Sequence, residues 1–142
     1  MNTITTENPG TSWWIRAEHL AVVIICTSLA FMHIKDIAWA RFFAAFLLID
    51  LLGYLPGALA FHKAAGNPIA PIYHLLYNLT HNYLVTGTCV ALWALTIGGP
   101  EWAMLAVPIH LSGDRGLLGN FSKPTSLPFE PLRPSKELVV TT

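Results

Sequence analysis

The feature of this sequence that most restricts its fold is a set of long apolar stretches separated by short polar ones. A bilayer core is about 30 Å thick, and a helix needs roughly 20 mostly apolar residues to cross it. Four stretches meet this requirement, at about residues 13–33, 37–61, 69–97 and 101–119. With 54% hydrophobic and only 11% charged residues, the chain has more apolar surface than one small soluble core can bury. We therefore predict an all-α fold, an integral membrane four-helix bundle.

The segments on either side of these stretches differ from them in composition. Residues 1–12 are largely polar, and the first stretch lacks the basic segment and the cleavage site of a signal peptide. We expect a polar segment at 1–12, a retained first helix, and a transmembrane domain at 13–120. From 121 to 142 prolines recur every few residues, which predicts an extended tail because proline interrupts helices and strands.

The distribution of basic residues predicts the orientation of the bundle. With four crossings, both termini and the loop between the second and third helices share one side, which carries Arg16, Lys63, Lys123, Arg133 and Lys136. The other side carries Lys35 and Arg41. Because loops rich in lysine and arginine stay in the cytoplasm, we expect both termini there. A bacterial inner membrane is the expected location.

Charge balance and cysteine content exclude several classes of function. The 8 basic and 8 acidic residues cancel, so the chain has no electrostatic surface for nucleic acid. Cys26 and Cys89 lie inside apolar stretches without the spacing of a metal site or a disulfide framework, which indicates a packing role. The expected partners are the lipid bilayer and a lipophilic small molecule. Four thin helices enclose little space, which favours a homo-oligomer.

Polar side chains lie within the apolar stretches, where burial is costly. A charged group at the bilayer centre costs at least ~2.5 kcal/mol, so such residues are normally paired, hydrated or functional. Asp50 lies near the middle of the second stretch. In the third stretch, His74, Asn78 and His81 follow one another at i, i+4 and i+7, which places them on one helix face. We expect this face to point into the bundle.

The fourth stretch adds a second pair of polar residues on one face. His110 and Asp114 are four residues apart, and Arg115 follows directly. In the predicted topology Asp50, His81 and His110 reach a similar depth near the middle of the membrane. The residues expected nearer the cytoplasmic mouth are His74, Asn78, Asp114, Tyr54, Arg16 and Glu18. Together these side chains predict one polar cavity that opens to the cytoplasm.

Short motifs along the chain resemble a small bacterial membrane-protein family, domain of unknown function 4260. The motifs are RAEHLAV in the first stretch, Asp50 followed by Gly53-Tyr54, YNLTHNY from Tyr77 to Tyr83, and HLSGDRGLLG from His110 to Gly119. The resemblance covers about residues 14–120 and implies a four-helix membrane fold, with no established activity. The positions that it singles out are Arg16, Glu18, Asp50, Tyr54, Asn78, His81, His110, Asp114 and Arg115.

The residue types at these positions suit proton-transfer chemistry. A carboxyl group in an apolar cavity beside imidazoles can serve as a general acid or base. We predict Asp50, His81, His110 and Asp114 as catalytic residues. The predicted substrate-binding residues are Tyr54, His74, Asn78, Arg115, Glu18 and Arg16.

Three other interpretations remain open for the same residues. The polar groups can form a structural hydrogen-bond network between helices. Asp114 with Arg115, and Arg16 with Glu18, can be ion pairs at helix ends. His81, His110, Asp50 and Asp114 also form a plausible ligand set for zinc or non-haem iron. We expect no cofactor, with a divalent metal as the alternative.

The sequence therefore supports two classes of function. The first is a membrane-embedded enzyme that performs acid–base chemistry, such as epoxide opening, cyclisation, isomerisation or hydrolysis, on a lipophilic small molecule. Its support is the convergence of acid, base and amide groups in an apolar pocket. The second is a non-catalytic binding or transport module, or an accessory subunit, with a polar relay in the bundle core.

Overall fold

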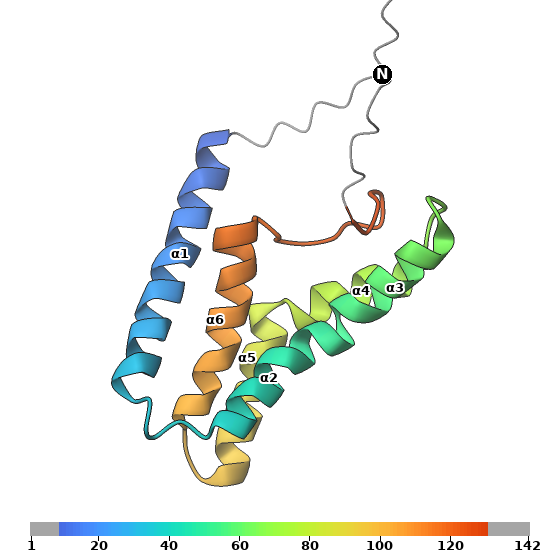
Figure 1. Ribbon diagram of the computed structural model, residues 1–142. Coiled ribbons are helices and arrows are strands. Elements are labelled where there is room, and N and C mark those ends of the chain that lie inside the picture. The colour runs from blue at the N-terminus through green and yellow to red at the C-terminus, as the bar shows by residue number, and fades with distance from the viewer. Residues whose placement is uncertain (1–8, 131–142) are drawn as a thin grey trace, which may run out of the picture.

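A computed structural model describes residues 9–130, which form helices and turns without any strand. The all-α prediction is confirmed. The elements, in order, are α1 (Pro9–Met32), α2 (Trp39–Leu52), α3 (Tyr54–Ala64), α4 (Pro71–Thr80), α5 (Tyr83–Ile97), the 3-10 turn η1 (Trp102–Leu105), α6 (Ala106–Gly113) and the π-helical turn η2 (Asp114–Leu118) (Figure 1). Residues 1–8 and 131–142 lie outside the described part. They include most of the predicted N-terminal segment and about half of the predicted tail.

The second and third predicted helices are each divided in two. The second is interrupted at Gly53. Gly53, Pro56 and Gly57 form a cluster in the sequence that predicts a kink here, because proline and glycine weaken helices. The third is interrupted at His81 and Asn82. The side chain of Asn82 accepts hydrogen bonds from the backbone N–H groups of the first turn of α5, so it starts a new helix.

Helix α6 lies beside α1 and contacts α2, so it forms the centre of the packed part of the molecule (Figure 1). Small side chains make this close packing possible. Ala30, Ala103 and Ala106 are buried in one cluster with Ile37 and Phe42, where the three helices meet near the turn between α1 and α2. A second cluster packs Ile49, which directly precedes Asp50 near the end of α2, against Val107 and Leu111 of α6.

The outer faces of the helices are strongly apolar. Phe31, Leu84 and Leu95 are among the exposed large side chains, each at least three quarters exposed. Two segments, Trp13–Met32 and Trp39–Ala64, are long and apolar enough to cross a membrane, whereas the apolar Tyr83–Ile97 is shorter. The sequence predicted four such helices. The interruption at Asn82 and the 3-10 turn before α6 divide the other two into shorter pieces.

The segment from residue 121 to 130, here called the strap, has no helix and crosses over α3 and α4 (Figure 1). Its anchor is Phe129, whose side chain is 1% exposed. The ring lies against Gly57, where a Cβ atom would come within 2.2 Å of it, and its edge meets Tyr77. The strap therefore closes the side of the molecule where α3 and α4 leave the bundle.

Candidate functional site

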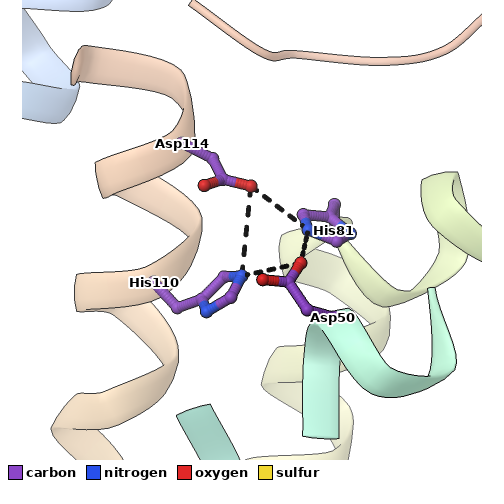
Figure 2. Close-up of side chains that lie close together, drawn as sticks. All are labelled: Asp50, His81, His110 and Asp114. Carbon is purple, nitrogen blue, oxygen red and sulfur yellow. Dashed lines mark ion pairs between the residues drawn. The ribbon is translucent and has the colours of Figure 1, made fainter. Parts of the chain in front are cut away.

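Four side chains from three separate parts of the chain meet inside the bundle. Asp50 comes from α2, His81 follows α4, and His110 and Asp114 come from α6 and the start of η2 (Figure 2). Each offers one nitrogen or oxygen atom, and these four atoms lie within 4.8 Å of one another. We call this group the four-residue centre. It consists of the residues predicted as catalytic.

Within the four-residue centre, each imidazole nitrogen Nε2 lies close to an oxygen of both carboxylates. Nε2 of His81 lies 3.3 Å from Oδ1 of Asp50 and 3.2 Å from Oδ2 of Asp114. Nε2 of His110 lies 3.5 Å from the same Asp50 oxygen and 3.9 Å from the same Asp114 oxygen. Both imidazoles thus face the same two carboxylate oxygens.

Exposure divides the centre into an inner and an outer half. The side chains of His81 and His110 are each 3% exposed, whereas those of Asp50 and Asp114 are 47% and 21% exposed. The imidazoles therefore form the floor, and the carboxylates form the rim. A molecule that enters would meet the carboxylates first.

Several contacts fix the orientation of His81. Its Nδ1 lies 3.0 Å from the carbonyl oxygen of Tyr77, and its ring stacks on the Tyr77 ring at a centroid distance of 3.9 Å. The hydroxyl of Thr80 lies 3.0 Å from the same Nδ1. Arg115 donates a hydrogen bond of 2.8 Å to the His81 carbonyl oxygen, which lies where α4 ends. The break in the helix thus serves to hold the imidazole in place.

The position of Asp50 depends on a glycine. Helices α2 and α4 approach so closely that a Cβ atom on Gly53 would lie 1.9 Å from the Thr80 hydroxyl oxygen. Only glycine leaves room for this approach without a shift of the backbone. Because Asp50 lies one turn before Gly53 and Thr80 directly precedes His81, the contact brings the carboxylate to the imidazole.

A cavity of about 490 Å³ adjoins the carboxylate rim. It is bounded by both carboxylates, by the strap and by the start of α3. Its lining residues are Asp50, Tyr54, Tyr77, Asp114, Leu118, Asn120, Lys123 and Glu130. The cavity is large enough for a small organic molecule and is polar at the end next to the centre.

The predicted substrate-binding residues are placed at different distances from this cavity. Tyr54 lines it and donates a hydrogen bond of 2.6 Å to Glu130. Asn78 exchanges two hydrogen bonds with the backbone of Lys123, and His74 lies 3.2 Å from the carbonyl oxygen of Leu127. These two residues of the polar helix face hold the strap.

The remaining predicted residues lie around the end of α6. Arg115 supports His81 and lies over the Tyr83 ring, 5.1 Å from its centroid. Arg16 donates to the carbonyl oxygens of Gly116 and Leu117, at 3.2 Å each, and so caps η2. Glu18 lies exposed on α1. The structure thus gives Arg115 and Arg16 backbone partners and brings neither to the cavity lining.

Two charged residues of the strap belong to the cavity but were missing from the sequence prediction. Lys123 donates a hydrogen bond of 2.6 Å to the Phe129 carbonyl oxygen and lies over the Tyr77 ring at 4.9 Å. Burial of its ammonium group lowers the pKa of Lys123 below its usual 10.5. Glu130 accepts the Tyr54 hydrogen bond. Neither lies in a periodic pattern, so no spacing rule could identify them.

Comparison with known proteins gives no further guide to this site. No protein-family model matches the chain, and searches of curated proteins and of solved structures find no match to it. The resemblance to domain of unknown function 4260 stays a prediction. The function is therefore argued from the geometry of the four-residue centre.

Proposed function

We propose that this chain is a membrane-embedded enzyme that performs acid–base chemistry on a lipophilic small molecule. The observation that carries the proposal is the meeting of two buried imidazoles and two carboxylates at the polar end of a cavity of about 490 Å³. Imidazoles and carboxylates are the side chains that most often serve as general acids and bases, and an apolar surrounding strengthens their electrostatic interactions. Epoxide opening, cyclisation, isomerisation and hydrolysis all need groups of this kind.

Exposure assigns the roles within the centre. Asp50 is the most exposed of the four side chains and lines the cavity, so its carboxylate is the group that exchanges a proton with the substrate. His81 and His110 lie behind it and can receive that proton or return it. Tyr54, on the same wall, is placed to orient a substrate oxygen through its hydroxyl.

The apolar outer surface supports a membrane location. Helix α1 has 24 residues, about 36 Å at 1.5 Å per residue, which exceeds the thickness of a bilayer core. Within the candidate span Trp13–Met32, Ala30 is the single buried residue. A soluble domain rarely exposes so much contiguous apolar surface. A substrate that dissolves in lipid would then reach the cavity from the bilayer.

Untargeted conversion of lipid extracts tests the proposed activity. The full chain, purified in detergent, is incubated with a lipid extract of the expression host, and mass spectrometry follows every component. We expect at least one component to be consumed by the wild type and spared by Asp50→Asn. His62→Ala, an exposed histidine outside the centre, is the matched control and should retain conversion.

Two results would count against the enzyme. One is conversion by Asp50→Asn at the wild-type rate. The other is loss of folded protein in Asp50→Asn and His110→Ala, with His62→Ala intact, because that pattern assigns the centre to assembly of the bundle. Protein that stays monodisperse in size-exclusion chromatography establishes that a variant is folded.

A further inference from the structure

Three of the four imidazole nitrogens of the four-residue centre lack hydrogen bonds. Among residues 9–130, Nε2 of His81 and both ring nitrogens of His110 are buried and have no hydrogen-bond partner. Nε2 of His81 lies 3.2 to 3.3 Å from two carboxylate oxygens but is aimed at neither of them. Buried polar atoms without partners are rare in native proteins and call for an explanation.

The environment of His81 determines which of its nitrogens carries a proton. The Tyr77 carbonyl oxygen, 3.0 Å from Nδ1, can only accept a hydrogen bond, so Nδ1 is the donor. The lone pair of a neutral His81 is then on Nε2 and faces the interior of the centre. A backbone carbonyl that orients an imidazole in this way is the usual second partner of a metal-bound histidine.

The spacing of the four atoms is close to that of a coordination shell. When metal–ligand bonds are about 2.0 to 2.1 Å long, neighbouring ligand atoms of a tetrahedron lie about 3.3 to 3.4 Å apart. The four nitrogen–oxygen distances in the centre are 3.2, 3.3, 3.5 and 3.9 Å, and all four atoms lie within 4.8 Å of one another, so the side chains would draw slightly closer around an ion. Figure 2 shows the four side chains pointing toward one common space. One cation in that space would contact all four atoms.

We infer that Asp50, His81, His110 and Asp114 form the binding site of one divalent transition-metal ion, with zinc the best fit. Two imidazole nitrogens and two carboxylate oxygens are ligands that zinc accepts in tetrahedral sites. Magnesium and calcium prefer shells made of oxygen alone, which these histidines exclude. The inference departs from our expectation of no cofactor, because the sequence could not show that the four atoms share one space.

The location of the site next to the cavity indicates the chemical role that the ion would have. Since the four side chains would fill a tetrahedral shell, a water molecule or a substrate oxygen would have to bind as a fifth ligand. The side next to Asp50, which is 47% exposed and lines the cavity, is where it could approach. A divalent ion lowers the pKa of bound water and polarises substrate oxygens. Resting on the proposed function, this property narrows the reaction to addition of water to the lipophilic substrate, by hydrolysis or epoxide opening. With the ion bound, Asp50, His81 and His110 would act as ligands, and metal-bound water would take over the proton transfer assigned to them above.

Metal content of the purified chain tests the site directly. The full-length protein in detergent is stripped with a chelator, reloaded with Zn²⁺ and freed of excess metal. We expect wild type and His62→Ala to retain one zinc per chain, measured by elemental mass spectrometry. The double variant His81→Ala/His110→Ala should retain almost none, and Asp114→Asn, which keeps an oxygen at the site, should bind zinc at least about tenfold more weakly.

Cobalt substitution adds a spectroscopic measurement that does not depend on activity. Co²⁺ in a four-coordinate site absorbs strongly in the visible range, and we expect this band in wild type and its loss in His110→Gln. Equal zinc content in wild type and the double variant would overturn the inference, as would a folded wild type that takes up no zinc. Zinc binding without any lipid conversion would support the metal site and contradict the proposed enzyme. Lipid conversion by a protein that binds no zinc would support the enzyme and contradict the metal site.

Discussion

At the scale of single residues, the side chain of Arg115 links the end of α6 to the end of α4. It follows Asp114 directly, yet its guanidinium group reaches the carbonyl oxygen of His81 in the break between α4 and α5. That carbonyl lies at the end of α4, where the backbone lacks its next helical partner. A cation there satisfies the oxygen and complements the helix dipole. Arg115 is therefore a positioning residue for the four-residue centre.

Replacing Arg115 should loosen the centre as well as the fold. Arg115→Leu leaves the His81 carbonyl oxygen without its charged donor, which costs about 1.5 to 3 kcal/mol of unfolding free energy. We expect a lower Tm in detergent and weaker zinc binding. Lys35→Leu, at an exposed site in the turn after α1, is the control and should change neither. An Arg115→Leu variant with wild-type Tm and zinc affinity would show that the contact has no positioning role.

Lys123 predicts a pH dependence of stability. Burial lowers the pKa of Lys123 below its value of 10.5 in an unfolded chain, although Glu130 and Asp114 act in the opposite direction. The unfolded chain therefore holds this proton more tightly, and native stability rises with pH between the two pKa values. Below that interval the charged lysine destabilises the native state by a constant amount.

The comparison of Lys123→Met with wild type isolates this contribution. We expect the difference in Tm between the variant and wild type to shift in favour of wild type as the pH rises toward 10.5, because the wild type loses its buried charge below that pH. Lys63→Met, an exposed lysine on α3, should show no such shift. Parallel pH curves for wild type and Lys123→Met would contradict the prediction.

The residues of the four-residue centre were accessible to sequence reasoning, whereas those of the strap were not. Asp50, His81 and His110 stand out because charged and imidazole side chains are costly inside apolar stretches. Helical spacing then aligns His110 with Asp114. Lys123 lies in a segment without periodicity, and its role follows only from the path that the strap takes over α4.

At the scale of elements, the closest approach of two helices lies beside the centre. Gly53 ends α2, and Thr80 ends α4, with its hydroxyl bonded to the carbonyl oxygens of Leu76 and Tyr77. The space between Gly53 and that hydroxyl cannot hold a methyl group. The distance from Asp50 to His81 therefore depends on a contact that neither residue makes itself.

A double-mutant cycle tests this contact. Gly53→Ala would place Cβ 1.9 Å from the Thr80 hydroxyl, so the helices must separate, and overpacking of this kind costs about 1 to 3 kcal/mol. Thr80→Ala in the same chain removes that oxygen and should recover part of the lost stability and zinc affinity. Additive effects of the two substitutions would mean that the residues do not interact.

The helix breaks show what apolar patterning can and cannot predict at this scale. Gly53 lies in a cluster of helix-breaking residues, so the bend was expected near that position. Asn82 lies in a stretch that otherwise continues as helix, and a single asparagine is tolerated in many helices. Its cap on α5 becomes favourable because His81 turns inward and Arg115 takes over the free carbonyl group. Arg115 lies 34 residues after His81 in the sequence, so local patterning does not reveal this contact.

At the scale of the whole molecule, the two ends differ in their basic residues. The end near the strap holds Arg16 and Lys123. The opposite end holds Lys35 and Arg41, and Arg41 forms a bidentate ion pair with Glu101 at N–O distances of 2.6 and 2.7 Å. With Lys63 added to the strap side, as in the predicted topology, the positive-inside rule leads us to expect that end in the cytoplasm.

Cysteine labelling in bacterial spheroplasts tests this orientation together with the membrane crossing. In a background of Cys26→Ala and Cys89→Ala, one variant carries Ser122→Cys in the strap and another carries Asp36→Cys in the turn between α1 and α2, both exposed positions. An impermeant maleimide should label Asp36→Cys from outside and Ser122→Cys only after lysis. The reverse pattern would invert the orientation, and labelling of both from outside would mean that α1 does not cross, since only a spanning helix separates the two sites.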